Sequence, residues 1–339
     1  MSSQSTALYE NLKLSRWAAI RLLCYALLAL VLVLCRQHYF WGTGLILLRW
    51  VLPVLGLLWW WRMRNRRMPV LLRVALVLVL VLSPAEWLYL KVQQERLAEG
   101  TQAGELRILT FNLYFKNSRP QATVAMIREQ QPDILLLQEM THIWKAALHP
   151  ALLDEYPHFK LFPRRGAYGL ALYSRHPIEE YQLLSLPKSP FYAQEATISF
   201  AGKRLRVYNA HLASPAIAVE HPAEFLGYYA SNYALRKDQI EDIAHKSAEG
   251  KEEYALQVLG GDLNTSRLDP LYNRLSRQWV DSHAGLMVWA APTFPHGTGP
   301  GPVLTLDYLM LKGAATVMST QTIAVTGSDH CAVMGSFAL

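Results

Sequence analysis

Three long apolar segments in the first hundred residues constrain this chain most, because each is long enough to cross a lipid bilayer. They span residues 17–35, 39–61 and 69–90, and a bilayer core of ~30 Å requires about 20 apolar residues in a helix. A secretory signal peptide would have one shorter apolar core followed by a small-residue cleavage site. The pattern therefore predicts three transmembrane helices over residues 17–90, preceded by a cytoplasmic N-terminus over residues 1–16.

Positive charge around these segments predicts their orientation. Residues 62–67, between the second and third segments, contain four arginines, and short loops rich in Arg and Lys stay in the cytoplasm. Lys13 and Arg16 place the N-terminus on the same side. We therefore expect a multi-pass membrane protein with everything after Lys91 on the periplasmic or extracytoplasmic side.

The basic charge of the chain belongs to this membrane segment. Residues 1–100 carry 12 Lys and Arg against 4 Asp and Glu, and the whole chain has a net charge of +7, which leaves −1 for residues 101–339. A basic protein often binds nucleic acid, but here the excess charge is explained by membrane topology. The three cysteines are too few and too scattered to predict a disulfide framework.

A polar linker over residues 91–104 leads into an α/β domain over residues 105–339. Apolar runs at 105–115 and 133–139 are typical of strands buried on both faces, and a helix predicted at 120–131 joins them into a βαβ unit. Further strands are expected at residues 168–173, 194–200, 204–211, 255–261, 304–311 and 331–338, and an amphipathic helix at 234–246. A domain of this size can bury a substantial core.

Polar side chains recur where these predicted strands begin or end. They are Asn112, Glu139, His211, Asp262 with Asn264, Asp307, and Asp329 with His330. One Asn or Asp at a strand end is usually a turn or cap residue, but six strand ends of this kind are hard to explain in that way. Because α/β folds place their sites at strand ends, the pattern predicts a single catalytic site.

In chain order, the motifs FN, QE, NAHL, GDLN, LDY and SDH resemble the signature of the endonuclease/exonuclease/phosphatase superfamily, whose fold is that of deoxyribonuclease I. The resemblance covers essentially all of residues 105–339 and is to a membrane-anchored, bacterial-type member. It implies a two-sheet, four-layer α/β sandwich, preceded here by the N-terminal helical transmembrane segment. It also implies a metal-dependent phosphoester hydrolase with its site at one end of the sheets.

The resemblance further implies a metal site. Glu139 would be the main ligand of Mg²⁺, with Mn²⁺ as the alternative, supported by Asn112 and Asp329. These residue types agree with the chemistry, because Mg²⁺ is a hard ion that binds one or two carboxylates and keeps several water molecules.

The remaining motif residues take catalytic roles by the same resemblance. Asp262 matches the residue that activates or orients the attacking water, and Asn264 would donate to the oxygens of the transition state. Asp307 would orient His330, which faces the phosphate. His211 would assist the leaving group or a transition-state oxygen.

Glu195 is predicted as a carboxylate partner of His211. Residues 194–200 and 204–211 form an expected hairpin, in which Glu195 lies roughly opposite Asn209 and diagonal to His211 on the same face. The alternative is an exposed strand residue, because a register shift of one residue would turn the side chain away.

Three further residues are candidates for binding substrate. Arg164 and Arg165 precede a predicted strand and either touch phosphate or are solvated loop charges, which are commoner. Tyr229 lies in the aromatic segment 214–233, which is either a loop that covers substrate or faces lipid, or a packed Ω-like loop. Arg236 and Gln239 are expected to be structural.

Together these features predict a membrane-anchored hydrolase that acts on a phospholipid headgroup or a small phosphoester outside the cytoplasm, by in-line attack of an Asp262-activated water. Its partners are the lipid bilayer and the phosphoester substrate, and we infer no obligate protein partner. The alternative is a Mg²⁺-dependent nuclease acting on extracytoplasmic nucleic acid, although duplex binding needs more positive charge than this domain has. A non-catalytic membrane binding module is the third hypothesis and the weakest, since every expected catalytic position holds a competent residue.

Overall fold

The computed structural model describes residues 104–215, 224–250, 253–267, 269–283, 291–297, 302 and 304–339. The predicted cytoplasmic N-terminus, the three membrane spans and the linker up to residue 103 lie outside these residues. In the part of the chain that the structure describes, no helix is both long and apolar enough to cross a membrane. The predicted α/β domain is described over most of its length.

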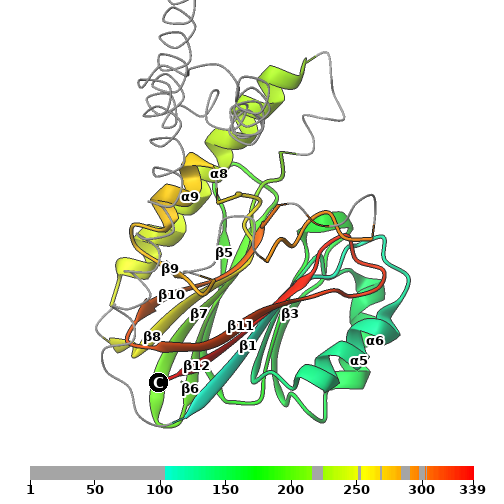
Figure 1. Cartoon of the computed structure of the whole chain (residues 1–339), viewed down its shortest axis with the longest axis vertical. Coiled ribbons are helices and arrows are strands. Elements are labelled where there is room, and N and C mark those ends of the chain that lie inside the picture. The colour runs from blue at the N-terminus through cyan, green and yellow to red at the C-terminus, as the bar shows by residue number, and fades with distance from the viewer. Residues whose placement is uncertain are drawn as a thin grey trace, which may run out of the picture. The chain divides into compact units, whose positions relative to one another are not determined.

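Two six-stranded sheets form the centre of this domain (Figure 1). The first has the order β11-β12-β1-β2-β4-β3, with β1 at Glu105–Asn112, β2 at Ile134–Gln138, β3 at His158–Phe162, β4 at Leu170–Ser174, β11 at Thr316–Ile323 and β12 at Ala332–Ala338. The second has the order β5-β6-β7-β8-β10-β9, with β5 at Ile178–Ser185, β6 at Tyr192–Phe200, β7 at Lys203–His211, β8 at Leu256–Asp262, β9 at Val280–Asp281 and β10 at Asp307–Gly313. Each sheet has one central parallel pair, β1 with β2 and β7 with β8.

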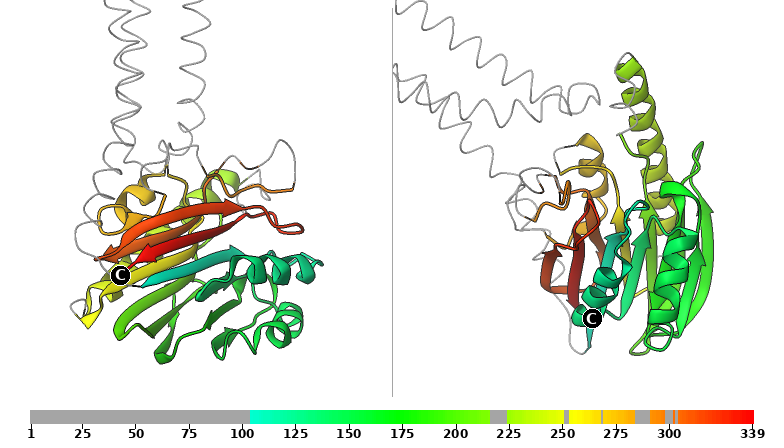
Figure 2. Two further views of the ribbon diagram at one scale, coloured as in Figure 1. Left: turned by 60° about the horizontal axis from the view of Figure 1, so that its bottom comes forward. Right: turned by 90° about the vertical axis from the view of Figure 1, so that its right-hand side faces the viewer.

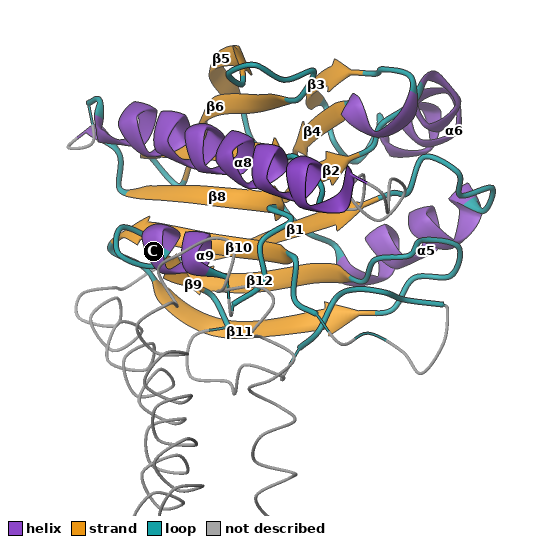
Figure 3. Cartoon of the chain, turned by 90° about the horizontal axis from the view of Figure 1, so that it is seen from above, coloured by secondary structure: helices purple, strands orange, loops and turns teal. Residues whose placement is uncertain are grey.

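Apolar side chains fill the space between the sheets, and helices cover their outer faces. Ile108 and Leu136 of the first sheet and Val207 and Val258 of the second belong to one buried cluster. Helices α5 (Pro120–Gln130) and α6 (His142–Leu152) lie over the first sheet, and α8 (Phe225–Ala248) runs along the second, with the short α9 (Pro270–Leu275) beside it (Figures 2 and 3). The expected two-sheet α/β sandwich is therefore confirmed.

A buried network of side-chain amides crosses the apolar layer and joins the two sheets. Gln138 at the end of β2 donates from Nε2 to Asn209 Oδ1 on β7 at 2.7 Å, and also to Thr110 Oγ1 at 3.0 Å. Asn209 donates in turn to Gln194 Oε1 at 2.8 Å and to the carbonyl oxygen of Ala171 at 3.0 Å. Because polar groups are costly to bury without partners, this network holds one relative position of the sheets.

The predicted strands appear as β1, β2, β4, β6, β7, β8, β10 and β12, with ends that differ by a few residues. Strands β3, β5, β9 and β11 were not predicted, nor was helix α6, which contains Pro150 in its interior, a residue that normally breaks a helix. The loop predicted over residues 214–233 is wrong from Phe225 onward, where α8 begins. Residues 216–223 of that segment lie outside the described residues.

Candidate active site

Asp262 lies at the centre of a row of polar residues at one end of the second sheet. It is the last residue of β8, where it pairs with His211 on the parallel strand β7 and with Asp307 on the antiparallel strand β10. The preceding Gly261 has a φ of 145°, and a Cβ at this position would lie 1.8 Å from the carbonyl oxygen of Ala210. Only glycine allows this approach, so the GGD sequence brings Asp262 directly beside His211.

The carboxylate of Asp262 is buried and is contacted from four directions. Its Oδ2 accepts a hydrogen bond from Asn112 Nδ2 at 3.0 Å, and its Oδ1 accepts one from the backbone N–H of Asn264 at 2.9 Å. The Nε2 atoms of His211 and His330 lie 3.5 and 3.6 Å from Oδ2. Residues from both sheets thus converge on a single carboxylate.

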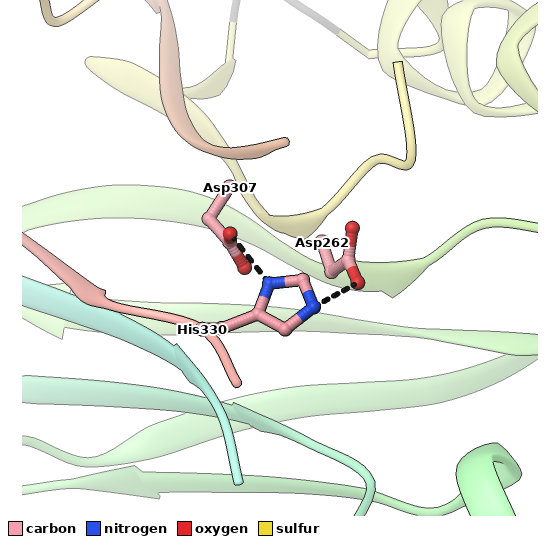
Figure 4. Close-up of side chains that lie close together, drawn as sticks. All are labelled: Asp262, Asp307 and His330. Atoms are coloured by element: carbon pink, nitrogen blue, oxygen red, sulfur yellow. Dashed lines mark hydrogen bonds and ion pairs between the residues drawn. The ribbon is translucent and has the colours of Figure 1, made fainter. Parts of the chain in front are cut away.

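His330 lies between two carboxylates, as Figure 4 shows. Its Nδ1 is 2.8 Å from Oδ2 of Asp307, while its Nε2 faces Asp262. Burial alone would lower the pKa of this imidazole, but the carboxylates of Asp307 and Asp262, with Asp329, outweigh burial and raise it to about 10. The side chain is therefore an imidazolium at neutral pH, with its Nε2–H group directed toward Asp262.

Glu139, Asn112 and Asp329 form a second group of oxygen-bearing side chains next to Asp262. Glu139 accepts hydrogen bonds from Asn112 Nδ2 at 3.2 Å and from the backbone N–H of Phe115 at 2.7 Å. Burial raises the pKa of Asp329 to about 6, against the lowering effect of His330 and with a further increase from Glu139. The buried Oδ1 of Asp329 has no hydrogen-bond partner among the described residues. Hard oxygen atoms and an unpartnered carboxylate oxygen fit a Mg²⁺ ligand set.

A second candidate metal group consists of Asp262, Asp307 and His330, whose ligand atoms lie within 4.8 Å of one another. The hydrogen bond between Asp307 and His330 already uses the imidazole Nδ1, and a metal bound there would have to displace its proton. We therefore assign Asp307 and His330 to proton and charge chemistry, and the metal to the group containing Glu139.

The predicted partnership between Glu195 and His211 is wrong. In the hairpin of β6 and β7, Gln194 rather than Glu195 pairs with Asn209, which is the shift of one residue that reverses the direction of a side chain. Glu195 instead forms an ion pair with Arg206 at 3.3 Å. The Nδ1 atom of His211 is 2.9 Å from the carbonyl oxygen of Ala167, and because a carbonyl only accepts, Nδ1 carries the proton.

Side chains with no predicted catalytic role hold two backbone segments of the site. Gln239 on α8 accepts from the N–H of Ala213 at 3.0 Å, and Arg236 donates to the carbonyl oxygen of Ala213 at 3.2 Å, which fixes the chain just after His211. Ser328 donates to the backbone carbonyl of Asn112 at 2.8 Å and accepts from the N–H of His330. The structural role expected of Arg236 and Gln239 is thereby confirmed.

The other predicted residues lie at the margin of the site. Asn264 donates from Nδ2 to the carbonyl oxygen of Leu212 at 2.9 Å, with a φ of 47° that turns it back toward Asp262. Arg164 and Arg165 are exposed on the loop that carries Ala167. Tyr229 is half-buried in the first part of α8. The substrate-binding roles of these last three residues stay predictions.

The sequence profile of the Endonuclease/Exonuclease/phosphatase family matches residues 109–330. No curated protein matches the sequence of this chain. Among solved structures, a humanized TDP2 of D. rerio is similar with a TM-score of 0.57 and 17% identity, covering 70% of this chain and 100% of that chain.

Two further structures give similar values. A truncated TDP2 of Caenorhabditis elegans has a TM-score of 0.54 and 20% identity, over 71% of this chain and 100% of that chain. An endonuclease/exonuclease/phosphatase from Beutenbergia cavernae DSM 12333 has a TM-score of 0.53 and 20% identity, over 70% of this chain and 72% of that chain. Identities this low show a shared fold.

We predict that Asp307→Asn lowers the pKa of His330 from about 10, because the nearest carboxylate is lost. Because the pKa of His330 is raised in the folded state, its pair with Asp307 stabilises the fold fully at pH values below about 6.5. This stabilisation is lost as the pH rises through about 10. Histidine NMR titration of both proteins measures the shift, with the exposed Asp154→Asn as control. An unchanged His330 titration in Asp307→Asn would contradict the assignment.

Proposed function

Since the chain belongs to the endonuclease/exonuclease/phosphatase family, we propose that it is a Mg²⁺-dependent phosphoesterase in which Asp262 activates a water for in-line attack on phosphorus. The observation that supports this most strongly is the convergence of Asn112, His211 and His330 on the Asp262 carboxylate, at 3.0, 3.5 and 3.6 Å. A carboxylate held in this way can accept a proton from water without moving. The arrangement is also fixed before substrate binds, which is the basis of electrostatic preorganisation.

Each neighbouring residue supplies one part of the reaction. The His330 imidazolium, held by Asp307, donates to a non-bridging phosphoryl oxygen and offsets the charge that develops there. His211 hydrogen bonds through Nδ1 to the carbonyl oxygen of Ala167, which leaves its Nε2, next to Asp262, for proton exchange with the leaving oxygen.

Glu139 and Asp329 would hold the Mg²⁺ ion. Asn112 would orient Glu139 rather than bind the ion, because its Nδ2 donates to Glu139 and its Oδ1 accepts from the N–H of Tyr114 at 2.9 Å. When bound, the ion would polarise the phosphoryl group and stabilise the leaving oxygen. The protein contributes the orientation of these ligands, since Glu139 is fixed by the N–H of Phe115 and by Asn112.

For the substrate we favour a phospholipid headgroup or a small phosphoester. The net charge of −1 over residues 101–339 supports this choice, since binding a duplex requires several cations at phosphates.

The second candidate is a nuclease acting on extracytoplasmic nucleic acid. One observation favours it, namely that a fold-related TDP2 of D. rerio has been solved with a single strand DNA product.

Hydrolysis of a chromogenic phosphodiester tests the proposed reaction. We expect activity in Mg²⁺ that EDTA abolishes, and a decrease in kcat of roughly 10³-fold in Asp262→Asn and in Glu139→Gln, a typical size for the loss of a charge-stabilising or proton-transferring group. Asp154→Asn, at an exposed position, serves as the control. Asp262→Asn protein with wild-type kcat would show that Asp262 is not the activating residue.

We also propose that the N-terminal segments anchor the domain in a membrane with the site on the outer side. The support is the three apolar segments and the four arginines of residues 62–67. Protease added to sealed, right-side-out vesicles is expected to digest residues 105–339. Digestion only after the vesicles are opened would reverse the proposed orientation.

A further inference from the structure

The loop of residues 163–169 connects the two sides of the active site through its backbone. The N–H of Arg164 donates to the carbonyl oxygen of Met140, next to Glu139, at 3.0 Å. Three residues later, the carbonyl oxygen of Ala167 binds His211. Gly169 ends the loop where a Cβ would lie 1.8 Å from the carbonyl oxygen of Met140. Residues between these points therefore have fixed positions at the margin of the site.

No acidic side chain of the described residues forms an ion pair with Arg164. Its guanidinium lies 5.4 Å from the ring centroid of Phe162 and 6.0 Å from that of Tyr192, an arrangement that orients the group by cation–π attraction. Within the described residues, Arg164 makes no ion pair or side-chain hydrogen bond, so its N–H groups are available. Arg165 is exposed beside it and is equally unpaired among those residues.

Some surface arginines of the domain are neutralised by acidic side chains, whereas Arg119 and Arg277 are exposed and form no ion pair among the described residues. Arg128 pairs with Glu155 at 3.0 Å, Arg204 with Glu180 at 2.7 Å, and Arg274 with Glu241 at 2.8 Å. Arg164 and Arg165 differ from Arg119 and Arg277 because they lie on the loop whose Ala167 carbonyl oxygen contacts His211.

Arg164 and His211 lie against different aromatic rings. His211 packs on the ring of Phe191, at 5.1 Å between centroids, whereas the Arg164 guanidinium lies over the rings of Phe162 and Tyr192. Since Tyr192 directly follows Phe191 in the chain, the two groups lie on neighbouring residues of one segment.

The site keeps a negative charge after its own cations are counted. Glu139, Asp262, Asp307 and Asp329 supply four carboxylates close together, against one positive charge on His330 and two on a bound Mg²⁺ ion. A substrate that brings a second negative group close to them is repelled unless positive charge faces that group. An Arg guanidinium suits this purpose because it binds phosphate oxygens in bidentate fashion.

We infer that Arg164 and Arg165 bind a second phosphate of the substrate, on the His211 side of the phosphate that is cleaved. This inference rests on the proposed function and narrows it to phosphoesters that carry a further phosphate group. A zwitterionic headgroup such as phosphocholine has no group for these arginines to bind.

Two matched pairs of probes test the inference on the full-length chain. The first is the dinucleotide TpT with its 5′- and 3′-phosphorylated forms, and the second is dihexanoyl phosphatidylinositol with its 4-phosphate. Wild-type turnover of each probe is measured, and binding is measured by calorimetry in Asp262→Asn protein, where the ligand is not cleaved. Binding by the double variant Arg164→Gln/Arg165→Gln is then compared with binding by Lys203→Gln, which removes a positive charge at the end of β7 opposite to His211.

We expect the phosphorylated member of at least one pair to bind about tenfold more tightly than its partner, as for a charge-assisted contact. The double arginine variant should remove this difference, and Lys203→Gln should preserve it. The pair in which the difference occurs identifies a nucleotide or a lipid source. Equal binding of the two members of both pairs, or equal weakening of both members in the double variant, would overturn the inference.

The result is independent of whether the proposed reaction is correct. If the wild-type chain cleaves none of the probes and the difference in binding persists in the Asp262→Asn background, the proposed reaction fails while the arginine site stands.

Discussion

The hydrogen bond between Gln138 and Asn209, 2.7 Å long and fully buried, joins two sheets that each carry half of the catalytic residues. Gln138 precedes Glu139 at the end of the first sheet, and Asn209 lies two residues before His211 in the second. Sheets packed only by apolar side chains can slide at small cost, but a buried amide without its partner costs about 1–3 kcal/mol. The network therefore fixes the distance between the metal ligands and the acid–base residues, and the geometry around Asp262 depends on it.

The sequence pattern predicted the central strands of each sheet but none of the edge strands. The strands that it identified are continuous apolar runs, because they are buried on both faces. Strands β3, β5, β9 and β11 are the four edge strands, and their side chains are mostly half-exposed or exposed. No apolar run marks such a strand, since its position is decided by the neighbour with which it pairs.

The candidate site was predicted better than the fold around it, because strand ends bring distant motifs together. Asn112, Glu139, Asp262, Asp307 and His330 all meet as expected. The error at Glu195 came from register, which depends on the turn at Ala201–Gly202 and could not be fixed by side-chain pattern alone. The carbonyl of Ala167, which replaced Glu195 as the partner of His211, is a backbone group and therefore leaves no sequence signal.

The stereochemistry at phosphorus tests the central claim, direct in-line attack by a water that Asp262 activates. A chiral phosphorothioate diester hydrolysed by the full-length chain in ¹⁸O-labelled water should give a product with inverted configuration and with one labelled oxygen on phosphorus. Retention of configuration would mean that a protein side chain attacks first and forms a covalent intermediate, which would contradict the role assigned to Asp262.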